Sequence, residues 1–110
     1  MTVNGWRIMW VLAVYDCPVS TPEERKRYQQ FHNLLLEENF SMEQFSVYLR
    51  HFPTMAAAEA EISKIGRRVP PNAKAAFFLL TDKQYSMTRE FLGPRTIKKE
   101  PPKQLQIELF

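Results

Sequence analysis

Asp16 is the side chain whose setting most clearly suggests chemistry, because it directly follows an apolar run over residues 8–15. That run is rich in β-forming side chains and predicts a central strand buried on both faces. A carboxylate at the carboxyl end of such a strand lies where sheets present ligands. One carboxylate alone is a poor Mg²⁺ site, since the ion prefers one or two carboxylates together with water and phosphate oxygens. A two-fold axis could supply a second copy of Asp16. Asp16 is therefore a candidate catalytic residue and metal ligand; the alternative is that it only caps the turn before Pro18.

Basic side chains are concentrated in the second part of the chain. Residues 1–63 carry 5 basic and 8 acidic side chains, whereas residues 64–110 carry 10 basic and 4 acidic ones. Such a segment favours contact with a polyanion, and we expect sequence-independent, salt-dependent binding to duplex phosphates. The candidate nucleic-acid-binding residues are Arg25, Arg27, Arg50, Arg67 and Arg68. The alternative is solvated surface charge or, for basic residues at the end of a helix, a complement to the helix dipole.

The single cysteine, Cys17, excludes an internal disulfide and a multi-cysteine zinc site. It could act as a nucleophile only beside a histidine base, and the sequence places neither His32 nor His51 next to it. This cysteine usage favours a reducing compartment, so we expect a cytoplasmic protein. The run over residues 8–15 is far shorter than the ~20 residues of a membrane-spanning helix, and no secretory cleavage site follows it, so we expect no membrane contact.

Periodicity and capping signals predict the elements that position these side chains. The expected order is a strand over residues 8–15, a helix from 22 to about 38, a strand over 42–52 that could bend midway, a helix from 55 to 69, a strand over 74–81 and a short strand over 87–92. Thr21 and Glu24 have the spacing of a capping box, Asn39 is a left-handed stop, and Thr54 caps the second helix. In the strand over 42–52, alternation places Phe45, Val47 and Leu49 on one face.

This order predicts an α+β fold, a ferredoxin-like βαββαβ sandwich with both helices on one face of the sheet. With 110 residues the chain has room for one core, which we assign to residues 1–93. Residues 94–110 then form a basic, proline-rich linker and an extra C-terminal strand. Its alternating apolar residues are Leu105, Ile107 and Leu109. A strand that follows a complete core can pair with another chain, so we expect an oligomer.

The residues also carry a family resemblance that covers nearly the whole chain from Ile8 onward. The matching segments are VYDCP (14–18), ERKRY (24–28), QFSVYLR (44–50), LTDKQY (80–85) and the terminal strand QLQIELF (104–110). In this order they resemble the smaller of the two core CRISPR adaptation proteins, the CRISPR-associated endoribonuclease family. The segments KQY (83–85) and QFSVY (44–48) resemble the branch found in type II systems. Residues 1–7 lie outside the resemblance, and Met9 is an alternative start.

The resemblance implies a symmetric homodimer that bridges integrase dimers and helps to insert foreign DNA into the CRISPR array. It also implies Mg²⁺-dependent endonuclease activity in some members, on single-stranded RNA or double-stranded DNA, with Asp16 as the metal-binding aspartate. In members with nuclease activity, arginines near the start of the first helix are important for that activity. The residues at these positions in this chain are Arg25 and Arg27. Several archaeal members have an arginine where this chain has Phe45, and that departure counts against efficient RNA cleavage.

Three functions stay open at this point. The chain could be a dimeric DNA-binding scaffold of spacer acquisition, or primarily a metal-dependent nuclease that uses Asp16 from each protomer. A ferredoxin-like regulatory domain that binds a small ligand is the third, and it would show no salt-dependent affinity for nucleic acid.

Overall fold

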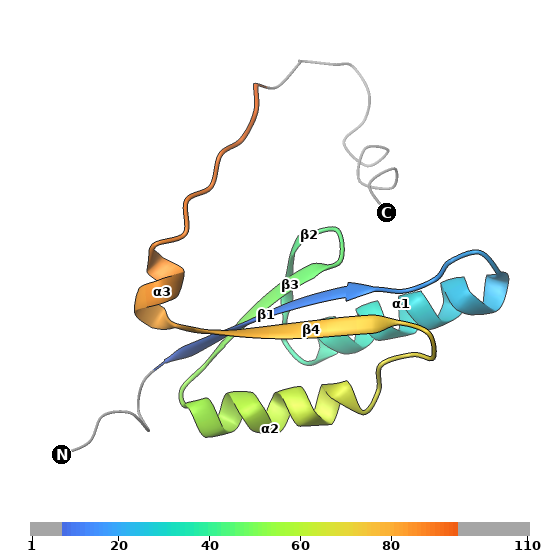
Figure 1. Cartoon of the computed structure of the whole chain (residues 1–110), viewed down its shortest axis with the longest axis horizontal. Coiled ribbons are helices and arrows are strands. Elements are labelled where there is room, and N and C mark those ends of the chain that lie inside the picture. Colours follow the sequence, from blue (N-terminus) through green and yellow to red (C-terminus); the bar gives the residue numbers. More distant parts are fainter. Residues whose placement is uncertain (1–7, 95–110) are drawn as a thin grey trace.

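The chain folds as one antiparallel sheet with two long helices packed on the same face (Figure 1). The computed structural model describes residues 8–94. The elements are β1 (Met9–Asp16), α1 (Pro22–Glu37), β2 (Ser41–Gln44), β3 (Val47–Phe52), α2 (Met55–Gly66), β4 (Lys74–Thr81) and α3 (Asp82–Ser86). The sheet has the order β2-β3-β1-β4, which with this sequence of elements is the predicted ferredoxin-like arrangement. None of the helices in the described range is long and apolar enough to cross a membrane.

Strand β1 is the centre of the sheet, and its two faces differ. Every second residue, from Met9 to Tyr15, is at most 3% exposed and packs against the helices. The residues between them, Trp10, Leu12 and Val14, are only half-buried. The sequence predicted burial on both faces, whereas within residues 8–94 one face of β1 is partly open to solvent.

Capping interactions fix the helix starts at the predicted residues. Thr21 accepts a hydrogen bond from the Glu24 backbone at 3.1 Å, and the Glu24 carboxylate accepts one from the Thr21 backbone at 3.0 Å. This reciprocal pair satisfies N–H groups that the first turn of α1 leaves without partners. Thr54 caps α2 by a single bond, in which its side-chain hydroxyl accepts from the Ala57 backbone N–H at 3.1 Å. Asn39 has a φ of 68° and ends the turn after α1, as predicted.

The predicted single strand over residues 42–52 is wrong: it is a hairpin of β2 and β3. The connection is Phe45-Ser46, and Ser46 has a φ of 66°, which turns the chain back. Phe45 therefore lies in the turn rather than on a strand face. Tyr48, which lies on the face opposite the predicted apolar one, is fully buried beneath the helices.

The predicted short strand over residues 87–92 is also wrong, because the chain forms α3 instead and has no strand from 87 to 94. Thr81 and Gln84 make a second capping box, which starts α3 directly after β4. Tyr85 of α3 stacks on Trp10 with ring centroids 4.0 Å apart, and Asp82 accepts a hydrogen bond from the Trp10 indole at 2.8 Å. These contacts hold α3 against the start of β1, at the end of the sheet away from Asp16 (Figure 1). The predicted C-terminal strand with Leu105, Ile107 and Leu109 lies outside the described residues.

Candidate functional site

Asp16 occupies the predicted place at the end of β1, where its side chain is exposed. Residues directly opposite one another on antiparallel strands share a face, so Asp16 lies on the open face of the sheet with Lys74 of β4 as its register partner. No hydrogen bond or ion pair to the Asp16 carboxylate occurs within residues 8–94. The carboxylate is therefore available to a ligand.

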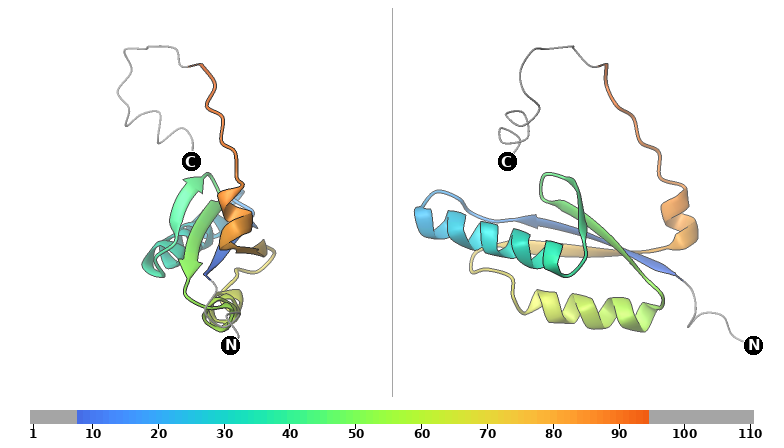
Figure 2. Two further views of the ribbon diagram at one scale, coloured as in Figure 1. Left: turned by 90° about the vertical axis from the view of Figure 1, so that its left-hand side faces the viewer. Right: turned by 180° about the vertical axis from the view of Figure 1, so that it is seen from behind.

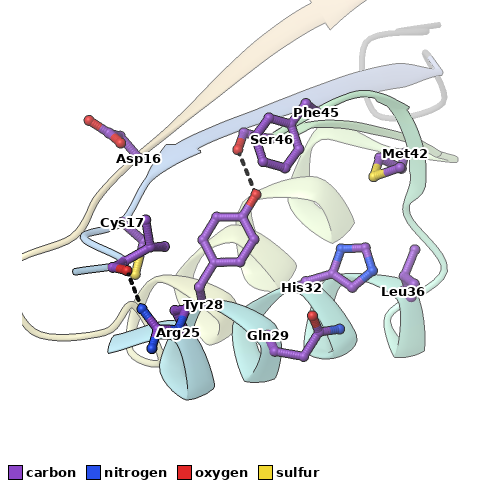
Figure 3. A pocket seen from close by; sticks show the side chains of 11 residues that line it. Asp16, Cys17, Arg25, Tyr28, Gln29, His32, Leu36, Met42, Phe45 and Ser46 are labelled. Carbon is purple, nitrogen blue, oxygen red and sulfur yellow. Dashed lines mark hydrogen bonds between the residues drawn. The ribbon is translucent and has the colours of Figure 1, made fainter. Parts of the chain in front are cut away.

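A pocket of about 770 Å³ opens beside Asp16, between α1 and the β2–β3 turn (Figure 3). Its lining includes Arg25, Tyr28 and His32 of α1, which recur at the spacing of one helix face. Ser46 contributes from the turn, and its hydroxyl lies 3.1 Å from the Tyr28 hydroxyl. Sequence reasoning singled out Asp16 and Arg25 but missed the other three as pocket residues. The helical spacing from Arg25 to His32 is the signal that could have grouped those of α1.

Arg25 stabilises the loop between Asp16 and α1 by hydrogen bonds to its backbone. Its guanidinium donates hydrogen bonds to the backbone carbonyls of Val19 and Ser20, at 3.1 and 3.4 Å. These bonds fix the β1–α1 loop, so Arg25 positions the rim of the pocket at the same time as it gives that rim a positive charge (Figure 3).

A buried network of hydroxyl groups lies beneath the pocket. The Tyr48 hydroxyl bonds His32 Nδ1 and lies 3.4 Å from the Tyr15 hydroxyl. Burial, aided by hydrogen bonding to Tyr48, raises the pKa of Tyr15 far above its ordinary value, so this phenol stays protonated. Desolvation by burial lowers the pKa of His32, so the imidazole is neutral near pH 7. The network ties the end of β1 to α1 and β3.

Cys17 lines the same pocket but is a poor nucleophile. Burial raises the pKa of its thiol, and the nearby carboxylates of Glu24 and Asp16 raise it further, while Arg27 opposes them. The pocket brings His32 closer than the sequence indicated, yet its Nδ1 is bonded to Tyr48. A thiol held in its protonated form argues against cysteine chemistry at this site.

The structure separates the two arginines at the start of α1. Successive residues of a helix are about 100° apart, so Arg25 and Arg27 project in nearly opposite directions. Arg27 lines a second, smaller pocket of about 380 Å³ on the other side of α1, together with Arg67 and Arg68 at the end of α2. Three of the five predicted nucleic-acid-binding arginines thus come together, although they come from separate helices.

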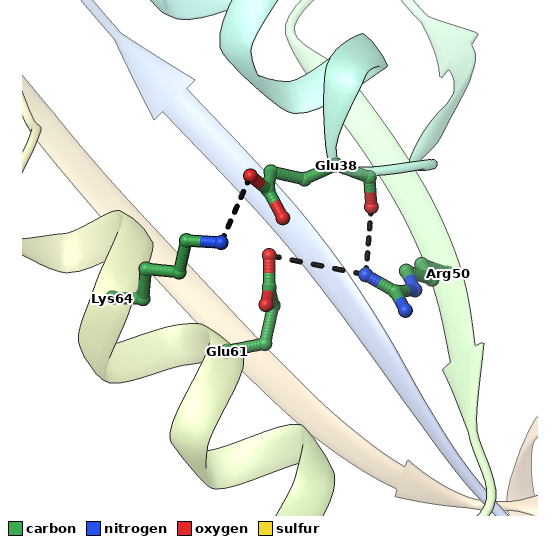
Figure 4. Close-up of polar contacts among 4 residues, drawn as sticks. All are labelled: Glu38, Arg50, Glu61 and Lys64. Carbon is green, nitrogen blue, oxygen red and sulfur yellow. Dashed lines mark hydrogen bonds and ion pairs between the residues drawn. The ribbon is translucent and has the colours of Figure 1, made fainter.

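Arg50 lies apart from both pockets, in a polar network between the helices (Figure 4). Its guanidinium donates to the Glu38 carbonyl at 2.7 Å, lies 3.8 Å from the Glu61 carboxylate and stands over the Phe52 ring at 4.3 Å. Lys64 forms an ion pair with Glu38 at 3.1 Å. Arg50 therefore links β3 to both helices, and its contact with nucleic acid stays a prediction.

Metal binding would depend on Asp16 together with groups from outside one protomer. Within residues 8–94 there is no group of three or more His, Cys, Asp or Glu side chains that could hold a metal ion. One exposed carboxylate fits the preference of Mg²⁺ for few protein ligands beside water and phosphate oxygens. The donor set thus suits a hydrated ion that is shared with a phosphate or with a second Asp16.

Comparisons with known proteins agree with this fold. The family described as CRISPR associated protein Cas2 matches residues 9–88. The CRISPR-associated endoribonuclease Cas2 of Flavobacterium psychrophilum is 36% identical over 108 residues, which cover 98% of this chain and 93% of that protein. The protein of the same name from Parvibaculum lavamentivorans is 38% identical over 100 residues, which cover 90% of this chain and 99% of the relative.

Solved structures give the same result. The crystal structure of Streptococcus pyogenes Cas2 at pH 6.5 superposes with a TM-score of 0.57 at 26% identity, and the match covers 76% of this chain and 99% of that one. A second crystal structure of a Cas2 chain has a TM-score of 0.53 at 21% identity, which supports the fold alone. With the family match over most of the described residues and relatives that align along nearly their whole length, the chain belongs to the Cas2 family of CRISPR-associated proteins.

Proposed function

We propose that the protein is a spacer-acquisition subunit: a symmetric homodimer that binds duplex DNA and bridges integrase dimers as they insert foreign DNA into the CRISPR array. Membership of the Cas2 family supports a role in a CRISPR system. The observation that carries the dimeric part of the proposal is the apolar, partly open face of the sheet.

Apolar side chains on this face come from three strands, although the one from β3, Leu49, is itself buried at 6% exposure. Register pairs Leu12 of β1 with Leu49 of β3 on one side and with Phe78 of β4 on the other. Phe78 is 52% exposed, although it lies near the middle of its strand. A contiguous apolar surface on a small protein marks an interaction site. A second copy is the partner that accounts for it, because the same self-complementary face is then covered in both protomers.

This dimer would also bear on Asp16. Residues 10, 12, 14 and 16 of β1 alternate onto the same face, so Asp16 borders the surface that the second copy covers. A two-fold axis near this end of β1 would bring both Asp16 carboxylates to one place. Bound there, Mg²⁺ would activate a water molecule and offset the charge that develops on a phosphate. Asp16 itself would orient the hydrated ion, while Arg25, whose guanidinium bonds backbone carbonyls of the β1–α1 loop, would hold that loop in place.

The second candidate function is a metal-dependent endonuclease that acts on single-stranded RNA or double-stranded DNA. The exposed Asp16 carboxylate has no hydrogen-bond or ion-pair partner among residues 8–94, which favours this function, as does the word endoribonuclease in the names of the relatives. Phe45 at the pocket beside Asp16 supplies no charge to a phosphate, which counts against efficient RNA cleavage. In this second function the dimer would form in order to pair the two Asp16 carboxylates for catalysis. In the first function catalysis by Asp16 would be dispensable.

Cleavage assays on Asp16→Asn test the catalytic function. We expect wild type to cut single-stranded RNA or duplex DNA with Mg²⁺ and to lose activity with chelator, whereas Asp16→Asn loses cleavage and retains its fold and DNA affinity. Glu59→Gln, which neutralises an exposed carboxylate of α2 distant in sequence from Asp16, is the matched control and should cut normally. Equal cleavage by wild type and Asp16→Asn would place the activity elsewhere.

The scaffold function has its own test. If neither wild type nor Asp16→Asn cleaves, we expect both to support integration when mixed with the integrase and a DNA fragment. Removal of residues 104–110 should abolish complex formation and integration. Integration that survives this truncation would contradict the assigned role of the terminal strand.

A further inference from the structure

The pocket beside Asp16 has a charged end and an uncharged end. Its charged lining residues, Asp16 and Arg25, lie together next to the β1–α1 loop (Figure 3). Arg25 is already bonded to backbone carbonyls of that loop. The opposite end is formed by the neutral imidazole of His32 and the apolar side chains of Leu36 and Met42. As lined by residues 16–46, the interior therefore suits an uncharged group rather than a phosphate.

Two aromatic rings border the middle of this pocket. Tyr28 of α1 and Phe45 of the β2–β3 turn have ring centroids 6.0 Å apart, inclined at 48°. Tyr28 is half-buried and packs against the hydrophobic core, whereas Phe45 is 46% exposed and lies outside that core. Packing of the protomer thus does not account for the position of Phe45. An aromatic surface of this kind stacks well on a flat ring of a ligand.

Hydrogen-bonding groups accompany the two rings. Tyr48 bonds His32 Nδ1 beneath the pocket, so Nε2 is the ring nitrogen that is left for a ligand. The hydroxyls of Tyr28 and Ser46 lie 3.1 Å apart and share one of their two protons in this bond, which leaves the other proton and further lone pairs. Gln29 adds an amide group. A purely apolar ligand would leave these groups unpaired, so the pocket suits a flat ring with donors and acceptors on its edge.

We propose that this pocket takes an unpaired nucleobase of single-stranded nucleic acid, whose ring stacks on Phe45 and Tyr28 while its sugar and phosphate stay at the Asp16 end. The inference rests on the proposed nucleic-acid-binding function and names the part of the nucleic acid that the pocket binds. A nucleobase combines a flat apolar ring with polar edges, and the pocket volume of about 770 Å³ has room for one. The bases inside a duplex are stacked and paired, so the pocket would favour single strands over duplex.

Binding of a labelled strand of about ten deoxythymidines to the full-length protein with Mg²⁺, followed by fluorescence anisotropy, tests the proposal. The comparison strand has the same length and charge but carries abasic sugars throughout. Wild type should bind the thymidine strand at least about fivefold more tightly than the abasic strand, because stacking of a base on an aromatic ring contributes about 5- to 150-fold. Phe45→Ala should lose most of this preference.

Two further variants separate stacking from a structural role of the turn. Phe45→Trp keeps an aromatic ring and should retain the preference for the thymidine strand. Phe91→Ala is the matched control, because it makes the same substitution at a phenylalanine that is 79% exposed beyond α3, and it should bind as wild type does. A Phe45→Trp protein with no more preference than Phe45→Ala would overturn the stacking.

The outcomes separate this inference from the proposed function. Wild type that binds neither the thymidine strand nor a duplex of DNA would overturn both. Wild type that binds the duplex but holds the thymidine and abasic strands equally would overturn the base pocket alone. Equal losses in Phe45→Ala and Phe91→Ala, or a preference that persists in Phe45→Ala, would place the base elsewhere.

A competition with thymidine monophosphate distinguishes a strand from a free nucleotide as the source of the base. We expect millimolar thymidine monophosphate to displace the strand from wild type no better than inorganic phosphate of equal ionic strength. Stronger displacement from wild type that is absent from Phe45→Ala would assign the pocket to free nucleotides and overturn its assignment to a strand.

Discussion

Replacing Tyr48 by phenylalanine removes a single oxygen from the network that anchors the end of β1. Tyr48 is fully buried, and its hydroxyl is shared between His32 of α1 and Tyr15 of β1. Tyr15 is the residue directly before Asp16, so this network helps to hold the candidate metal ligand in place. We expect Tyr48→Phe to fold and to be less stable than wild type.

The size of this loss of stability depends on whether the groups that lose the Tyr48 hydroxyl can form hydrogen bonds with water instead. A net intramolecular hydrogen bond is worth about 1 kcal/mol, and a stranded buried polar group costs about 1–3 kcal/mol. His32 is half-buried and can be rehydrated, whereas Tyr15 is 3% exposed and keeps only its interaction with Tyr28. We therefore expect a loss of about 1–2 kcal/mol in the free energy of unfolding.

Urea unfolding at pH 7.5, followed by tryptophan fluorescence at one fixed protomer concentration, measures this loss. Tyr28→Phe is the matched control, because it deletes the same atom from a half-buried tyrosine whose partner is Ser46 at 3.1 Å. Its loss should be at most about half as large, since water can replace the bond. Equal losses in the two variants, or a Tyr48→Phe protein as stable as wild type, would refute the assignment of the network as a buried anchor.

Two further predictions concern other parts of the protomer. Burial, followed by hydrogen bonding to Glu38, raises the pKa of Glu61, so its contribution to stability is complete below the ordinary carboxyl pKa and is lost as pH rises through the raised value. The Glu61→Gln variant has no carboxyl group at this position that can ionise. When the free energy of unfolding is measured from pH 4.5 to 8, wild type should lose stability relative to this variant as pH rises. A difference in unfolding free energy that stays constant with pH would contradict this. Phe78→Glu places a charge in the proposed dimer face and should weaken dimerisation by at least about 100-fold, since an unpaired buried charge costs several kcal/mol. Light scattering measures the dimerisation of this variant, with Met87→Glu, at an exposed position off the sheet, as the control. If Phe78→Glu is still a dimer, this face is not the dimer interface.

The long helices and the central strands could be predicted from the sequence because their signals are local. Thr21 and Glu24 are three residues apart, and each satisfies the backbone of the other whatever the rest of the chain does. The hairpin was missed because the residue at positive φ in its turn is Ser46. A glycine at this position would have indicated a turn, whereas a serine does not. Helix α3 was missed for a related reason: the Thr81 capping box is local, but the stack of Tyr85 on Trp10 joins residues 75 positions apart.

The candidate site was only partly predictable for the same physical reason. Asp16 stands out because it ends an apolar strand, which is a feature of neighbouring residues. The grouping of Arg27 with Arg67 and Arg68 depends on how α1 and α2 pack side by side on the sheet, as Figure 2 shows from behind. Their separation in sequence carries no trace of that proximity. The sequence could therefore nominate the arginines individually but could not choose which of them act together.

The opposed faces of the sheet make the proposals independent of one another. The open face carries Phe78, whereas Arg27, Arg67 and Arg68 line the smaller pocket among the helices that cover the other face. Phe78→Glu should consequently alter dimerisation while each protomer keeps these arginines, and neutralising the arginines should alter DNA affinity in a protein that still dimerises. Asp16 borders the open face and should respond differently: its catalysis, if it depends on a paired carboxylate, is lost in Phe78→Glu as well as in Asp16→Asn. Cleavage by a monomeric Phe78→Glu protein would show that one Asp16 suffices, and the two-fold axis would then have no catalytic role.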